Sequence, residues 1–135
     1  MVKGQIPEPV LSALLDALPI EFSIVDANDK VMAWNRHETR LFRRVENVLG
    51  RDVRQCHPSK SLQMVEQIIS EMKQGKRDSA EFWLDLRVPD QEQPEKVLIQ
   101  YFALRDSEGS YLGCLECSQK LNRLQRIQGQ KRLLD

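Results

Sequence analysis

The chain has 135 residues, of which 41% are apolar and 30% are charged, and its formal net charge is zero. These values are typical of one globular domain with its own core, and they argue against a disordered chain or a strongly basic nucleic-acid binder. The arginines between residues 40 and 54 alternate with acidic side chains, so we interpret this segment as solvated surface and expect no nucleic-acid partner.

Cysteine usage and hydropathy indicate a cytoplasmic protein. The chain has three cysteines, an odd number without the paired spacing of a zinc site, which favours a reducing compartment and predicts no disulfide and no metal centre. No apolar run approaches the length needed to span a bilayer, so we expect no membrane partner.

An amphipathic helix is the first predicted element. Apolar side chains recur at helical spacing between Pro9 and Pro19, and Pro19 stops the helix. A β-hairpin follows over residues 21–35, because two apolar runs flank Asp26-Ala-Asn-Asp29, and Asp and Asn residues suit tight turns. The hairpin delivers a polar residue, Asn35, directly after Trp34.

The segment between the hairpin and the middle of the chain is predicted to be helical. Residues 36–53 fit two short helices, with Gly50 as a terminator. The longest helix follows Pro58, with Ser59 or Ser61 as its N-cap, and ends at Gly75. Its apolar face consists of Leu62, Val65, Ile68, Ile69 and Met72.

Three strands complete the predicted sheet. Residues 79–88 alternate between apolar and polar, with Trp83 as an apolar side chain on the polar face. Residues 96–104 are apolar on both faces, which suits an interior strand, and residues 111–118 form the last strand. Residues 121–132 then predict an amphipathic C-terminal helix, interrupted by Gly129.

The order of these elements, and the residues themselves, resemble the PAS domain. The stretch ALLDALPIEFSIVDANDKVMAWN looks like a PAS opening. The segments LGRDVRQCHPSKS, GKRDSAEFWLDL, YFALRDSEGSYLGCLE and GQKRLL resemble the PAS module that bacterial and archaeal proteins carry beside a hemerythrin-type HHE cation-binding region. The HHE region itself is absent from the sequence, and Lys120-Leu121-Asn122 stands where PAS domains often have Asp-Ile-Thr.

The resemblance implies an α+β fold: a five-stranded antiparallel sheet in the order 2-1-5-4-3, with helices covering its concave face around a small cavity. We divide the chain into an N-terminal segment (1–10), a PAS domain with its preceding helix (11–120) and a C-terminal helical extension (121–135). We expect a sensor or interaction domain in signal transduction, which binds a small ligand in the cavity, mediates dimerisation, or does both. The predicted ligand-binding residues are Phe22, Ile24, Phe42, His57, Val65, Ile69, Phe82, Leu84 and Tyr101.

Surplus apolar surface predicts a homodimer. A leucine stripe on the first helix lies outside the minimal PAS core, and an exposed tryptophan lies on the sheet, and together they would form a patch that water disfavours. The predicted interface consists of Leu11, Leu14, Leu15, Leu18 and Trp83. The alternative is that the helix folds back over its own sheet and covers Trp83 within one chain.

Two other functions stay open. His57 in Cys56-His57-Pro58 could ligate haem iron in a redox or gas sensor, although Pro58 holds it extended, where its ring could instead bond to a carbonyl or cover the helix start. A ligand-free protein–protein interaction module would result if Phe22, Phe42, Phe82 and Tyr101 filled the core. The sequence does not identify a cofactor.

Catalytic chemistry is not expected. No nucleophile has a base and an orienting partner in a recognised motif, and the residual alternative is an isomerase or hydrolase that uses Glu21, His57 or Glu81 as a base. Cys114 and Cys117 are three apart on a strand, so their side chains point to opposite faces and are not expected to share a metal.

Overall fold

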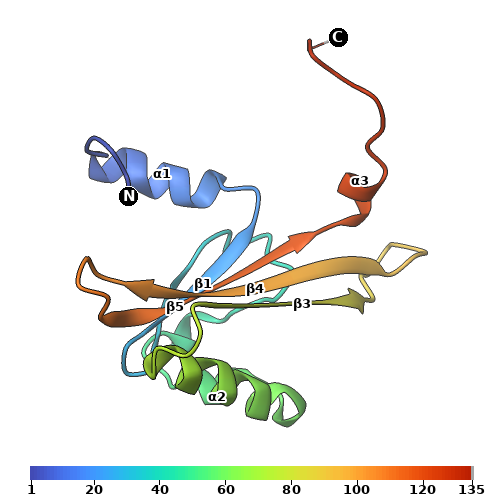
Figure 1. Cartoon of the computed structure of the whole chain (residues 1–135). Helices are drawn as coiled ribbons and strands as arrows, with labels where there is room; N and C mark the ends of the chain where they lie inside the picture. The colour runs from blue at the N-terminus through green and yellow to red at the C-terminus, as the bar shows by residue number, and fades with distance from the viewer. Residues whose placement is uncertain (135) are drawn as a thin grey trace.

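A five-stranded antiparallel sheet organises the chain in the computed structural model, which describes residues 1–134 (Figure 1). The strand order is β2-β1-β5-β4-β3, which confirms the expected α+β topology. The strands are β1 (Glu21–Asp26), β2 (Val31–Trp34), β3 (Ser79–Leu86), β4 (Glu95–Arg105) and β5 (Tyr111–Lys120).

Aspartates build both tight hairpin turns. Asp26 Oδ1 accepts hydrogen bonds from the amides of Asn28 and Lys30 at 2.9 and 3.0 Å, and this turn joins β1 to β2. Asp106 Oδ1 accepts two amides in the same way between β4 and β5. An aspartate side chain that accepts hydrogen bonds from the backbone amides that follow it stabilises a tight turn. The two hairpin turns are therefore encoded by the local sequence.

The helices lie on opposite sides of the sheet: α1 (Glu8–Ala17) on one side and α2 (Ser59–Lys73) on the other (Figure 1). The two short helices expected before α2 are 3-10 turns, η1 (Glu46–Val48) and η2 (Val53–Cys56). The face of the sheet that packs against α2 is called the inner face below, and the opposite face is called the outer face.

The ends of α2 differ from the prediction at one point. Neither predicted serine caps the helix: Pro58 is the N-cap without a side-chain hydrogen bond, and Ser61 Oγ donates to the Pro58 carbonyl at 3.2 Å. Proline fits this position because it lacks an amide hydrogen and its backbone is already restricted. Past the other end, Gly75 has a φ of 74° and its amide bonds to the Met72 carbonyl.

The predicted C-terminal helix is reduced to one turn, α3 (Asn122–Gln125). This turn buries no side chain, and a short helix without a buried apolar face is marginal in water. Gly129 then has a φ of 65°, which a continuing helix does not allow. Residue 135, the last of the predicted extension, lies outside the described residues.

The core lies between α2 and the inner face. Val65 and Met72 of α2 and Val97 of β4 are fully buried there, at 0% exposure. None of the helices within residues 1–134 is long and apolar enough to cross a membrane.

The register of β1 corrects the predicted direction of its side chains. Ser23 pairs with Glu116 of β5, and both line the inner face, whereas Phe22 pairs with Cys117. Phe22 and Ile24 therefore lie on the outer face, not on the inner face. The polar residues take the inner positions because they find partners there: the Arg40 guanidinium donates to Ser23 Oγ at 3.1 Å.

Candidate functional site

A small internal cavity lies between the inner face of the sheet, α2 and the loop that carries η2. Its volume is about 20 Å³. This space holds about one water molecule, whereas pockets for small organic ligands measure roughly 300–1,000 Å³. It is lined by Ser23, Val25, Val31, Arg44, Val53, Cys56, His57, Val65, Ile69, Tyr101, Cys114 and Glu116.

A cluster of polar side chains occupies one side of this cavity. Glu116 lies on β5 beside Tyr101 of β4, its register partner. The His57 ring approaches Glu116 from the end of η2, with Nε2 3.7 Å from Glu116 Oε2, and its Nδ1 lies 3.0 Å from the Val53 carbonyl oxygen. Arg44 adds a buried Nε that has no hydrogen-bond partner among the described residues.

The protonation states of His57 and Glu116 depend on the side chains around them. The Glu116 carboxylate raises the pKa of His57 above its ordinary value, against the effect of burial. Burial acts to raise the pKa of Glu116, but His57, Tyr101 and Arg44 outweigh it, so the pKa falls below its usual value. These shifts favour the charged forms of both side chains, the His57 imidazolium and the Glu116 carboxylate. A ligand that hydrogen-bonds to either group would change these pKa values.

Cys56 and Cys114 line the cavity, and Cys114 is buried there. Burial raises the pKa of the Cys114 thiol to about 12, so the thiolate is scarce at neutral pH. Cys114 lines the cavity, and Cys117 lies in the outer-face row of Phe22, as their spacing on a strand predicts. Within residues 1–134 no group of three or more His, Cys, Asp or Glu side chains could hold a metal.

The predicted ligand-binding residues are distributed over three places. His57, Val65, Ile69 and Tyr101 line the cavity. Phe42 and Phe82 pack against the core without reaching the cavity lining, and the Phe82 ring stacks on Tyr101 at 5.9 Å between centroids. Leu84 is 36% exposed on the edge strand, and Phe22 and Ile24 lie on the outer face as described above. Ligand binding by these residues stays a prediction.

Three residues of the cluster were not predicted from the sequence: Glu116, Arg44 and Ser23. A signal for Glu116 was available, because Cys114 and Glu116 share one face of the strand by alternation, and a charged residue inside an interior strand is buried with a partner. No comparable signal identified Arg44, which resembles the other arginines of its loop.

The two glutamates considered as bases are engaged elsewhere. Glu21 accepts the amides of Leu41 and Phe42 at 2.6 and 3.0 Å, and Glu81 accepts a hydrogen bond from Gln100 at 3.0 Å on the outer face. Neither of them lines the internal cavity.

The predicted dimer surface is exposed in the single chain. Leu11 and Leu14 are 39% and 40% exposed, and Leu15 and Leu18 are half-buried. Trp83 is 63% exposed, so α1 lies on the outer face of the sheet without covering it, and that part of the intrachain alternative is wrong.

Comparison with known proteins agrees with this architecture. A family model described as a PAS domain matches residues 11–122. The C-terminal domain of a Streptococcus mutans protein is similar to this chain, with a TM-score of 0.81 and 25% identity over 95% of each chain. No curated protein matches the sequence.

Two more distant structures share the fold. A sensory box sensor histidine kinase from Vibrio cholerae has a TM-score of 0.56 at 17% identity, over 83% of this chain and 89% of that one. VqmA bound to DPO has a TM-score of 0.58 at 20% identity, over 83% of this chain and 56% of that one.

Proposed function

The chain belongs to the PAS domain family, and on that premise we propose that it is a non-catalytic sensor and interaction domain that acts as a homodimer. The observation that supports this most is α1, which is 10 residues long and buries none of them. Helices shorter than about 12–15 residues are marginal in water unless an apolar face is packed. A second copy of the chain supplies the same leucine stripe by two-fold symmetry, so each α1 covers the other.

The outer face of the sheet extends the proposed interface. Trp83 pairs in register with Leu98, and Ile24 and Phe102 pair with Leu115, so all five side chains share the face on which α1 lies. Trp83 is the most exposed of them, and the other four are half-buried. Association would remove this apolar surface from water at about 25 cal/mol per Å².

Sedimentation equilibrium of the wild type and Leu14→Glu tests the dimer. We expect a wild-type dimer and a folded monomeric variant, because a carboxylate on the stripe has no partner in the interface. Ala13→Glu is the matched control, since at 100° per residue it lies on the opposite face of the same helix, and it should stay dimeric. A monomeric wild type at high micromolar concentration would contradict the proposal.

A second function is supported by the polar cluster of the cavity. We propose that Glu116, His57, Tyr101 and the unpartnered Arg44 Nε bind a small polar ligand. Any ligand larger than water requires the wall formed by residues 41–57 to move, since the cavity is about 20 Å³. The similar VqmA is bound to DPO in its solved structure, so DPO is one compound to test.

Native mass spectrometry and an absorption spectrum of the freshly purified protein test for this ligand. A retained mass that Glu116→Gln loses supports the cavity site. Unliganded protein that no compound stabilises against heating supports instead the ligand-free interaction module.

The geometry gives less support to a haem sensor that uses His57. The Nδ1 of His57 is engaged by a carbonyl, its Nε2 faces Glu116, and the cavity is far smaller than a porphyrin. Saturable one-to-one haem binding with a Soret shift that His57→Ala abolishes would restore this alternative.

The sequence resemblance is the basis for a proposal about the setting of the domain. We propose that it works beside a hemerythrin-like HHE region, as the PAS modules it resembles do. Its three thiols are unpaired, which fits a reducing cytoplasm.

A further inference from the structure

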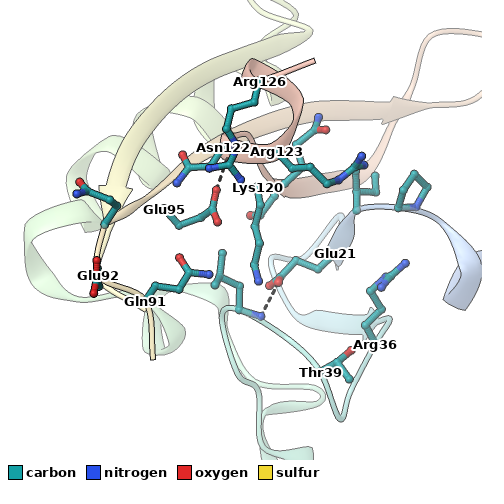
Figure 2. Close-up of a pocket in the computed structure, with 16 residues that line it drawn as sticks. Glu21, Arg36, Thr39, Gln91, Glu92, Glu95, Lys120, Asn122, Arg123 and Arg126 are labelled. Carbon is teal, nitrogen blue, oxygen red and sulfur yellow. Dashed lines mark hydrogen bonds between the residues drawn. The ribbon is translucent and has the colours of Figure 1, made fainter. Parts of the chain in front are cut away.

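A polar groove opens at the end of the sheet where the chain enters β1 and leaves β5 (Figure 2). Its volume is about 770 Å³, and it shares no lining residue with the internal cavity. This volume lies within the range of roughly 300–1,000 Å³ that small-molecule sites occupy. One wall is formed by the end of β5 and α3, and the facing wall by the segment that enters β1 and the segment that follows β2. Residues 91–95, which lead into β4, complete the lining.

Two of the carboxylates in the groove already have partners. Glu21 accepts two backbone amides of the 41–42 loop and lies 3.3 Å from the Arg40 guanidinium, and it is 8% exposed. Glu95 Oε2 accepts the Asn122 amide at 2.9 Å and is 5% exposed. The remaining lining carboxylate, Glu92, is exposed at the rim. The buried acids therefore do not pair with the cations of the groove.

Those cations come from both walls. Lys120, Arg123 and Arg126 belong to the β5–α3 wall and are exposed, and none of them forms an ion pair with a carboxylate of residues 1–134. Arg36 lies on the facing wall, where its Nε donates to the Leu18 carbonyl at 2.9 Å. Its backbone amide donates to Asp16 Oδ1 at 2.8 Å, but its guanidinium forms no ion pair with a carboxylate of residues 1–134. Figure 2 shows the four side chains around the hollow. Cations on opposite walls suit a ligand with more than one anionic group.

The rest of the lining narrows the class of ligand. Gln91, Gln93 and Gln119 add amide groups that can donate hydrogen bonds, and the lining contains no Phe, Tyr or Trp on which a base could stack. We infer that this groove binds a small organic anion that carries two or more carboxylate or phosphate groups, without a nucleobase.

Such a ligand would contact both the segment that enters the sheet from α1 and the segment that leaves it after β5. Arg36 holds the Leu18 carbonyl at the end of α1, and Asn122 joins the chain exit to β4 through its amide and through Oδ1, which accepts the Lys96 amide at 3.1 Å. The site is independent of the cavity and of the leucine stripe, so it goes beyond the sensor and dimer functions proposed above.

Calorimetric titration tests the inference with citrate, inorganic pyrophosphate and, as a neutral control, glycerol, in about 50 mM salt to limit screening. We expect citrate, pyrophosphate or both to bind one-to-one, and glycerol not to bind. Binding of citrate alone identifies carboxylates as the ligand groups, and binding of pyrophosphate alone identifies phosphates. Failure of both anions to bind overturns the inference.

Charge-matched variants separate a site from diffuse attraction. Arg123→Gln with Arg126→Gln should weaken binding about tenfold or more, because two charge-assisted contacts are lost. Lys131→Gln with Arg132→Gln removes the same charge from the exposed tail outside the groove and should change the affinity less than about twofold. An equal loss in both double variants overturns the inference.

Amide chemical shifts locate the ligand. Citrate or pyrophosphate should move the signals of residues 91–93 and 119–126 and leave those around His57 unchanged. Shifts confined to His57 and its neighbours would overturn the groove site and would instead support the cavity function. The dimer test by sedimentation is unaffected by either result.

Discussion

Replacing Asn35 by alanine tests how α1 is attached to the sheet. Asn35 is 5% exposed and its side chain makes three hydrogen bonds. Its Oδ1 accepts the Phe22 amide at 2.7 Å, and its Nδ2 donates to the Leu15 and Ile20 carbonyls at 2.8 and 3.0 Å. No residue of α1 is fully buried, so these polar contacts are a main part of what fixes the end of the helix against the sheet.

The cost of Asn35→Ala follows from those contacts. Each hydrogen bond contributes about 1 kcal/mol net, and a buried amide left without a partner costs about 1–3 kcal/mol. The Phe22 amide is the buried group, so we expect the free energy of unfolding to fall by about 2–4 kcal/mol. This is a large part of the roughly 5–15 kcal/mol that stabilises a typical domain.

Urea unfolding at equilibrium measures this loss, and hydrogen exchange reports whether the amides of residues 15–22 lose protection. Asn28→Ala is the matched control, because Asn28 is exposed in the β1–β2 turn and its side chain makes no hydrogen bond in the described chain. We expect the control to change stability by less than about 0.5 kcal/mol. A loss below about 1 kcal/mol for Asn35→Ala would refute the proposed attachment.

Three further predictions concern the site and the sheet. Because Glu116 raises the pKa of His57 above the ordinary 6.5, the ion pair stabilises the fold below that pH and its contribution is lost as the pH rises through the raised pKa. Urea unfolding should therefore show a larger loss for His57→Gln at about pH 5.5 than at about pH 9, and an equal loss at both would contradict the ion pair. Phe82→Ala should cost about 2 kcal/mol, because the ring is half-buried on an edge strand and stacks on Tyr101; a loss below about 0.5 kcal/mol would mean that the ring does not pack on the inner face. Gly113→Ala should prevent stable folding, as judged by circular dichroism, because its Cβ would collide with a backbone oxygen of β1; a variant as stable as the wild type would rule out this close approach.

Local pattern was sufficient to predict most of the elements. Alternation over residues 79–88 and the apolar face of residues 62–72 predicted β3 and α2, because burial on one face imposes a period of 2 or 3.6 residues. The aspartates of the two hairpin turns accept hydrogen bonds from amides no more than four positions away. These turns could therefore also be predicted from the sequence. The PAS resemblance supplied the strand order, which is the order observed.

Long-range contacts decided the features that the sequence left open. The alternating pattern of β1 allows either of its faces to be buried. Glu21 and Ser23 lie on the inner face because their polar groups are hydrogen-bonded there by Arg40 and by the amides of the 41–42 loop, which are 17 to 21 positions away in the chain. The C-terminal helix stops after one turn, which buries none of its side chains.

The sequence by itself determined most of the secondary structure and the family, since periodicity, turn chemistry and motif order are properties of neighbouring residues. Only the tertiary structure decided which polar side chains lie together. The small cavity, the pairing of His57 with Glu116, and the groove where Arg36 faces Arg123 each join residues that are far apart in the chain. Such contacts depend on how the sheet and helices pack, and packing is set by shape and polar partners that no local pattern records.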